Sequence, residues 1–153
     1  MIDQRLQELG ITLPPFVPPL YSYIAVKVHR GVARVSGQVP RVEGAMQHPG
    51  KVGAEVSIEQ AREAAEICTL RALSALRHSL GSLDRVEQVL SLNGFVSSTP
   101  DFIMQPKVID AASELLERVF GEAGKHTRTA VGVASLPNDA PVMIDFTFAV
   151  TDE

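Results

Sequence analysis

Arg128 is the residue of this sequence whose type and setting most clearly favour ligand chemistry. It falls in a segment with the pattern of a β-strand, 127–136, and its same-face neighbours Ala130, Gly132 and Ala134 are small. A planar guanidinium can hold a carboxylate through two parallel hydrogen bonds, so an arginine beside open space suits a small organic acid. The same pattern fits an arginine that pairs with an Asp or Glu at a subunit contact, and both interpretations stay open.

No other set of residues has the spacing of a metal, nucleophile or cofactor site. The four histidines are scattered and the chain has a single cysteine, so we expect no metal. Ser36 and Ser113 lack the Gly-x-Ser-x-Gly pattern of a nucleophilic serine. The glycines lack the spacing of a phosphate-binding loop, and we expect no cofactor. Cys68 falls on a stripe of small residues in a predicted helix, which favours a buried thiol.

Composition predicts one domain over residues 1–153, in which 1–20 form an N-terminal helix and a proline-rich extension. The net charge is −4, aromatic residues make up 5% and there is no tryptophan. Nucleic acids are therefore not expected as partners, because they require clustered basic residues and stacking rings. No apolar run of about 18 residues exists, and residues 1–10 lack the continuous apolar stretch that a signal peptide has. We expect a cytoplasmic protein without a membrane partner.

Periodicity and turn residues predict an alternation of strands and helices. Arg30-Gly31 separates two segments rich in β-branched residues and predicts a β-hairpin. Ser57-Ile58-Glu59-Gln60 matches a capping box at the start of a helix. The first half of the chain is expected to form a helix over 1–9, an extended connector over 13–19, strands over 23–29 and 32–36, and a long loop over 37–56. A helix over 57–80 and a strand over 85–96 follow; Gly94 interrupts the alternation of this strand, for which we expect a bulge. The remaining elements are a helix over 107–120 with Pro106 in its first turn, and strands over 127–136 and 141–150.

The order ββαβαββ predicts an α+β fold with both long helices packed on one face of a sheet. Alternation in the last strand divides its side chains into two sets, which are Val142, Ile144, Phe146, Phe148 and Val150 on one side and Met143, Asp145, Thr147 and Ala149 on the other. If the helices cover one side, we expect the remaining apolar side to be buried against another subunit. An oligomer is therefore the physical expectation.

Two segments resemble the signatures of a known family. Ser36-Gly37-Gln38-Val39-Pro40 and the stretch 128–137 (RTAVGVASLP) look like the two signatures of the RidA/YjgF superfamily, also called endoribonuclease L-PSP-like. Tyr23, thirteen residues before Ser36, falls where that family keeps a pocket tyrosine. The stretches 50–53 and 121–126 look like a longer-chain subgroup. The resemblance runs from about residue 23 to residue 150.

This resemblance implies a chorismate-mutase-like (YjgF-type) fold with a mixed sheet. It also implies a homotrimer whose ligand clefts lie between neighbouring subunits. In deaminating relatives the arginine that matches Arg128 grips the carboxylate of a small 2-imino or enamine acid. The matching positions Tyr23, Ser36, Gly37 and Ala130 are implied to line the cleft.

Position 143 departs from the family pattern. Met143 lines the implied cleft where the family has a glutamate that orients the attacking water, and a methionine can neither orient water nor relay a proton. Asp145 lies two residues further on the same strand face, about 7 Å along the strand. It could substitute only with a shifted ligand, and a solvated or interface charge is the other interpretation.

Three functions remain as hypotheses, and whether the protein is an enzyme stays open. The first is a hydrolase that converts 2-imino or enamine acids to 2-keto acids. The second is a non-catalytic or regulatory protein that binds a small carboxylate metabolite, with Arg128 as the clamp. The third is endoribonuclease activity, against which the acidic charge, the few aromatic residues and the absence of a histidine pair all count.

Overall fold

Two local signals in the sequence define the main helix and the first hairpin. The computed structural model describes residues 1–152, so Glu153, the last residue of the expected domain, lies outside the described residues. Helix α2 (Ile58–Leu80) begins at the predicted capping box, where the Ser57 hydroxyl accepts from the Gln60 N–H at 3.1 Å and the Gln60 side chain accepts from the Ser57 N–H at 3.0 Å. Strands β1 (Val26–His29) and β2 (Val32–Gln38) turn at Arg30 and Gly31, whose φ angles of 49° and 74° suit a two-residue hairpin turn.

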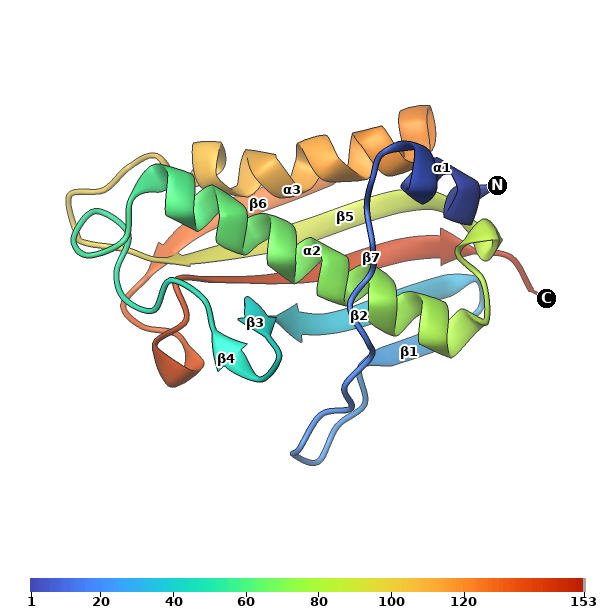
Figure 1. Ribbon diagram of the computed structural model, residues 1–153, viewed down its shortest axis with the longest axis horizontal. Coiled ribbons are helices and arrows are strands. Elements are labelled where there is room, and N and C mark those ends of the chain that lie inside the picture. The colour runs from blue at the N-terminus through green and yellow to red at the C-terminus, as the bar shows by residue number, and fades with distance from the viewer. Residues whose placement is uncertain (153) are drawn as a thin grey trace.

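The main sheet has five strands in the order β1-β2-β7-β5-β6 (Figure 1). Strand β5 spans Val86–Ser97, β6 spans Thr127–Val133 and β7 spans Val142–Val150. The sheet is mixed, because β5 and β6 run parallel across helix α3 (Gln105–Phe120) while the other pairs are antiparallel. The predicted order of elements and the mixed sheet are confirmed. Strand β7 lies between β2 and β5 rather than beside β6, which precedes it in the chain.

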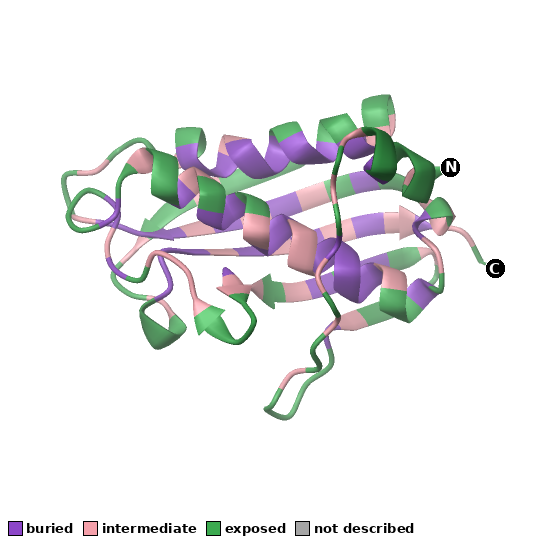
Figure 2. Ribbon diagram, in the orientation of Figure 1, coloured by how far each residue is buried: buried purple, intermediate pink, exposed green. Residues whose placement is uncertain are grey.

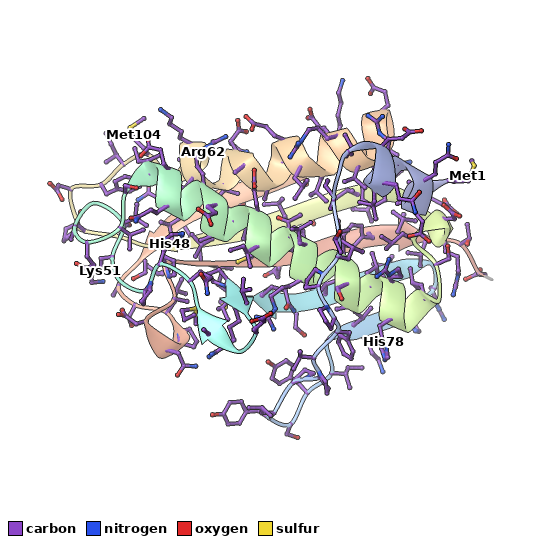
Figure 3. All side chains as sticks on the ribbon, viewed as in Figure 1. Met1, His48, Lys51, Arg62, His78 and Met104 are labelled. Carbon is purple, nitrogen blue, oxygen red and sulfur yellow. The ribbon has the colours of Figure 1, made fainter. Side chains whose placement is uncertain are left out.

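Both long helices cover the same face of this sheet, as predicted (Figures 1 and 2). The five apolar residues of β7 that share one side are all buried beneath the helices. Small residues let α2 approach the strands closely, and Ala61, Ala65, Cys68 and Ala72 are fully buried. An ion pair of 2.9 Å between Arg62 of α2 and Glu114 of α3 joins the two helices. Figure 3 shows Arg62 near the start of α2.

The uncovered face of the sheet is mixed in character, which corrects the expectation of a second apolar side. On β7 this face carries the half-buried residues Met143, Asp145, Thr147 and Ala149. Asp145 accepts a hydrogen bond of 3.0 Å from the side-chain amide of Asn93 on β5. Alternation put the apolar residues of β7 on a single side, and the helices already cover that side.

The structure tests two expectations about irregular segments. The loop predicted over 37–56 is wrong in part, because it contains a small hairpin formed by β3 (Arg41–Val42) and β4 (Ala45–Met46). The predicted irregularity of β5 is confirmed near the start of the strand, where its register shifts between 86 and 88 and between 89 and 91, and not at Gly94. Gly94 is needed for packing instead: a Cβ there would lie 2.5 Å from the Cδ1 and Cγ1 atoms of Ile109 on α3.

The ends of the strands and the N-terminal segment complete the described chain. The predicted strand over 23–29 begins only at Val26, since the Tyr23 N–H closes a turn by donating to the Tyr21 carbonyl at 2.8 Å. The predicted strand over 127–136 ends at Val133. Helix α1 (Ile2–Glu8) confirms the predicted N-terminal helix and buries Leu6. None of the helices in residues 1–152 is both long and apolar enough to cross a membrane.

Candidate functional site

A cavity of about 490 Å³ lies where the end of β2 meets the start of β7. Its outer wall is the strap, which we define as residues 15–23. The prolines of the strap fix an extended backbone, and the segment is tied to α2 by a 2.6 Å hydrogen bond from the Ser74 hydroxyl to the Pro14 carbonyl. The Phe16 ring also stacks on the His78 ring with centroids 4.2 Å apart. The strap is therefore held against α2 at its base.

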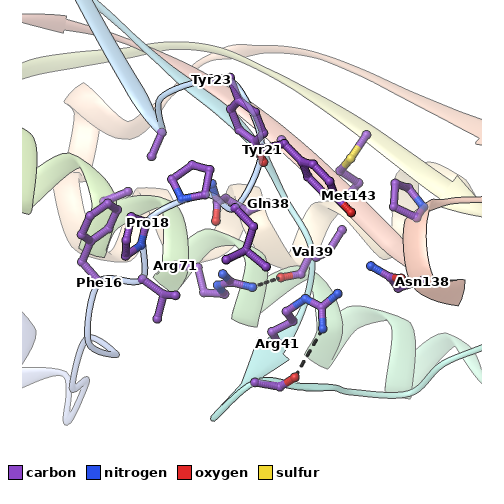
Figure 4. A pocket seen from close by; sticks show the side chains of 18 of the residues that line it. Phe16, Pro18, Tyr21, Tyr23, Gln38, Val39, Arg41, Arg71, Asn138 and Met143 are labelled. Carbon is purple, nitrogen blue, oxygen red and sulfur yellow. Dashed lines mark hydrogen bonds between the residues drawn. The ribbon is translucent and has the colours of Figure 1, made fainter.

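The lining of this cavity is largely apolar and aromatic, with a few polar groups (Figure 4). It consists of Pro15, Phe16, Val17, Pro18, Pro19, Leu20, Tyr21, Tyr23, Ala25, Gly37, Gln38, Val39, Arg41, Gly44, Arg71, Ala75, Pro137, Asn138 and Met143. A concave apolar site with a small number of polar anchors is the usual form of a small-molecule site.

The structure brings three of the residues singled out in the sequence to this cavity, namely Tyr23, Gly37 and Met143. Ser36 does not line it but lies next to Gly37. The Ser36 hydroxyl donates to the Ile24 carbonyl at 2.8 Å, and the Ser36 N–H donates to the Ala25 carbonyl at 2.9 Å. Ser36 therefore fastens the end of the strap to β2 and helps to position Tyr23.

Asp145 is not among the residues that line the cavity. Its carboxylate is held by Asn93 on the uncovered face of the sheet. The structure thus separates Asp145 from Met143 along the strand, in agreement with the shift of about 7 Å that the strand rise predicts for two residues.

Arg128 and Ala130 lie at the far edge of the sheet, on β6. Strand β6 is two strand spacings of about 4.8 Å from β7 and three from β2. The Arg128 side chain also points to the helix side, where it contacts α3, whereas Met143 lies on the uncovered side. Within one chain, Arg128 therefore does not reach the cavity that Tyr23, Gly37 and Met143 line.

The guanidinium of Arg128 is held by three groups of α3. One terminal nitrogen, Nη1, donates to the Asp110 carboxylate at 2.7 Å and to the Ser113 hydroxyl at 3.0 Å, and Nη2 donates to the Pro106 carbonyl at 3.3 Å. The small residues beside Arg128 thus leave room for α3, which corrects the expectation of open space there. Of the two interpretations, pairing with an acid is observed, and the acid belongs to the same chain.

A serine–histidine pair adjoins Arg128, and the sequence did not reveal it. The Ser113 hydroxyl lies 2.8 Å from Nε2 of His126, whose Nδ1 lies 2.6 Å from the Gly124 carbonyl. A carbonyl can only accept, so in the neutral ring Nδ1 carries the proton and Nε2 accepts from Ser113. Ser113 then accepts from Arg128, and the chain of bonds fixes the orientation of the guanidinium.

Sequence reasoning also missed Arg41 and Arg71, which line the cavity from β3 and α2. They are thirty residues apart in the chain and in different elements, so no local spacing pointed to them. The Val39 carbonyl accepts from Nη1 of Arg71 and from the backbone N–H of Arg41, both at 2.9 Å.

No group of three or more His, Cys, Asp or Glu side chains in residues 1–152 is arranged to hold a metal ion. Cys68 is buried, and this burial raises the pKa of its thiol far above the usual value. The thiol is 3.8 Å from the Val142 carbonyl and stays protonated near neutral pH. It therefore serves packing rather than nucleophilic chemistry.

Comparison with known proteins gives concordant matches. Residues 3–150 match the family model described as "YjgF/chorismate mutase-like, putative endoribonuclease". Protein TCP17 of Trypanosoma cruzi is 41% identical over 145 residues, which cover 94% of this chain and 91% of the relative.

Two solved structures are similar over nearly the full chain. Atu1372 of Agrobacterium tumefaciens, a protein of unknown function, is 40% identical with a TM-score of 0.90, covering 98% of this chain and 92% of that one. A protein described as a "putative endoribonuclease" from Shewanella oneidensis is 28% identical with a TM-score of 0.93, covering 98% and 99%.

Proposed function

The chain belongs to the YjgF/chorismate-mutase-like (RidA) family, and from this premise we propose that it binds a small carboxylate metabolite in clefts between the subunits of a homotrimer. Arg128 of one subunit grips the carboxylate. Tyr23, Gly37 and Met143 of the next subunit line the rest of the cleft, with Ser36 behind them. Ala130 follows Arg128 along the edge of the sheet.

One observation carries this proposal. The residues that match the ligand-lining positions of the family fall into two groups, Tyr23, Gly37 and Met143 at the cavity and Arg128 with Ala130 on β6, three strands from β2. Within a single chain, neither group forms a complete ligand site. If edge strand β6 of one copy lies at the cavity of another copy, the two groups together complete the site, and a closed ring of subunits would place them in this way.

The exposed apolar side chains of the strap support a contact with a second copy. Leu20 is 93% exposed, Tyr21 83% and Val17 64%. Figure 1 shows this segment projecting from the body of the molecule. Apolar side chains gathered beside a cavity are typical of a surface that another chain covers.

Part of the Arg128 guanidinium is available to a ligand. Its bonds to Asp110 and Ser113 both use Nη1, Nη2 donates to the Pro106 carbonyl at 3.3 Å, and among the described residues nothing bonds its Nε. Nη2 carries a second N–H, so the Nε and Nη2 edge can present two parallel donors to a carboxylate. Asp110 and Ser113 act as positioning residues that hold this edge in place.

Hydrolysis of a bound 2-imino or enamine acid to a 2-keto acid would be a further step beyond binding. Imine hydrolysis adds water to the C=N carbon and releases ammonia, so it needs a group that orients water and moves a proton. Met143 offers neither, and Asp145 does not line the cavity. The lining therefore favours a non-catalytic protein that binds and senses this class of acid over an imine hydrolase.

The test uses light scattering and mixed oligomers. We expect a trimer by light scattering, and loss of 2-oxobutyrate binding in the separate variants Arg128→Gln and Tyr23→Ala. Unfolding and refolding the two variants together restores some clefts in which both halves are native, so binding returns in part. A stable monomer at micromolar concentration, or no recovery in the mixture, would overturn the shared cleft.

A further inference from the structure

The cavity beside the strap holds two arginines and no acidic residue. Arg41 and Arg71 both line it, and none of its lining residues is Asp or Glu. The chain as a whole has 18 acidic and 14 basic residues, so composition alone would favour more acidic than basic residues in the lining. Two cations in a concave, mostly apolar site create a local positive potential that attracts anions.

Arg71 is only partly exposed and has no acidic partner. Within the described residues, no carboxylate lies within 4.0 Å of either arginine, although seven other ion pairs form. Burial lowers the pKa of the Arg71 guanidinium, and the positive charge of Arg41 lowers it further. A guanidinium remains charged at neutral pH even so. The desolvated charge is therefore left for an anion to neutralise.

The two arginines also lie near one another, because both line the same cavity and the charge of Arg41 acts on Arg71. The Val39 carbonyl accepts from the backbone N–H of Arg41 at 2.9 Å. The two side chains bind separate carbonyls: Nη1 of Arg71 donates to Val39 at 2.9 Å, and Nη1 of Arg41 donates to Gly44 at 3.3 Å. Figure 4 shows both side chains in the cavity with these two bonds to backbone oxygens. Neutral carbonyls fix the side chains but do not compensate their charge. The remaining N–H groups of the two guanidinium groups are free to bind an oxyanion.

We infer that Arg41 and Arg71 bind an oxyanion of the ligand, so that this cavity selects acids with a second anionic group, a carboxylate or a phosphate. The apolar and aromatic residues of the strap, Phe16, Tyr21 and Tyr23, contact the body of the ligand. The inference rests on the proposed function in one respect, because Arg128 of another subunit takes the first carboxylate.

The test compares two ligands of equal chain length, 2-oxoglutarate and 2-oxopentanoate, by calorimetry. A hydrogen bond to a charged group contributes about 1.5–3 kcal/mol, so the native protein should bind the dianion about ten- to a hundredfold more tightly. The variants Arg71→Gln and Arg41→Gln should each reduce this preference, and the double variant should abolish it. Arg77→Gln, on the same helix but outside the cavity, should preserve it.

Competition by simple anions identifies the oxyanion. Inorganic phosphate that displaces 2-oxoglutarate better than acetate does would indicate a phosphorylated acid, and the reverse a dicarboxylic acid; either result supports the site. Equal affinity for the two oxo acids in the native protein, or a preference that survives in the folded double variant, would overturn it. If Arg71→Gln does not fold, Arg41→Gln, on the short surface hairpin, still decides the matter.

The failure of this inference and that of the proposed function are distinguishable. Arg128→Gln should weaken both ligands to the same degree and leave their ratio unchanged. If Arg128→Gln has no effect while the Arg41 and Arg71 variants lose the ratio, the proposed cleft is wrong and the anion site stands. If Arg128→Gln abolishes binding while the ratio is always near one, only the anion site is wrong.

Discussion

The Met143 thioether packs against the backbone of Gly37: a Cβ at residue 37 would lie 3.0 Å from the Met143 sulfur and 3.1 Å from its Cγ. Residue 37 has no side chain, and this leaves the space that the side chain of residue 143 occupies at the cavity. The chemistry of the cavity at this point therefore depends on which side chain residue 143 carries. The first three predictions concern residues 143, 145 and 128, the fourth concerns strand β5, and the last concerns the core.

The first prediction concerns the change Met143→Glu. If the cleft otherwise retains its geometry, the new carboxylate should orient water and accelerate hydrolysis of 2-iminobutyrate by about 10²- to 10⁴-fold relative to the native protein. The imine is generated in place by an amino-acid oxidase, and its loss is followed beyond the spontaneous rate. Met143→Gln, similar in size but without a base, is the matched control and should show the rate of the native protein.

The second prediction separates Asp145 from that role. Asn93 holds the Asp145 carboxylate on the uncovered face of the sheet, and Asp145 does not line the cavity. Asp145→Asn should therefore leave the rate of imine hydrolysis measured for the native protein unchanged. A native protein that deaminates rapidly and loses this activity in Asp145→Asn, with ligand affinity retained, would show that Asp145 supplies the missing group.

The third prediction concerns Arg128→Lys. Lysine keeps the positive charge but loses the planar fork, and it cannot reproduce the bonds to Asp110 and Ser113 together with two parallel bonds to a ligand. Calorimetry with 2-oxobutyrate should show affinity reduced about tenfold or more. Arg118→Lys, at an exposed position of α3, should bind normally. Equal affinity in the two variants would remove Arg128 from the site.

The fourth prediction concerns the packing of β5 on α3. In Gly94→Ala the new methyl group would meet Ile109, which is fully buried and has no free space to enter. Overpacking of this kind lowers the free energy of unfolding by about 1–3 kcal/mol, which urea denaturation measures. Adding Ile109→Val should recover part of the loss. Additive losses in the double variant would mean that the two residues do not compete for the same space.

The fifth prediction concerns the thiol of Cys68. Burial raises its pKa, so at pH 8 the native protein holds almost no thiolate at this position. Iodoacetamide should leave the native chain unmodified and alkylate the urea-unfolded chain within minutes, as mass spectrometry can follow. Because the chain has one cysteine, the signal is unambiguous. Equal rates for both states would contradict the burial.

Local sequence signals determined most of the secondary structure. The capping box at Ser57 and Gln60 and the turn at Arg30 and Gly31 act within four residues, so they operate in any fold that contains those segments. The strict alternation of β7 likewise fixed which of its residues are buried before its partners were known. The family resemblance added the expectation of a mixed sheet.

Tertiary structure alone decided which strands pair and hence which candidate residues meet. Strands β6 and β7 follow one another in the chain but do not pair. Instead β7 pairs with β2 and β5, and β6 lies at an edge of the sheet. That arrangement separates Arg128 from Met143 within one chain. Strand pairing depends on which apolar faces the helices can cover together, and this is a property of the whole chain.

The same reason explains why Arg41 and Arg71 escaped notice. Arg41 lies on strand β3 and Arg71 on helix α2, and only the fold brings both to the same cavity. Ser113 and His126 meet around Arg128 in the same way, from a helix and from the start of a strand. The sequence by itself determined the elements and the residue types suited to bind an acid. The three-dimensional packing decided which of these residues share a site, because side-chain contacts between distant segments follow from packing and not from spacing along the chain.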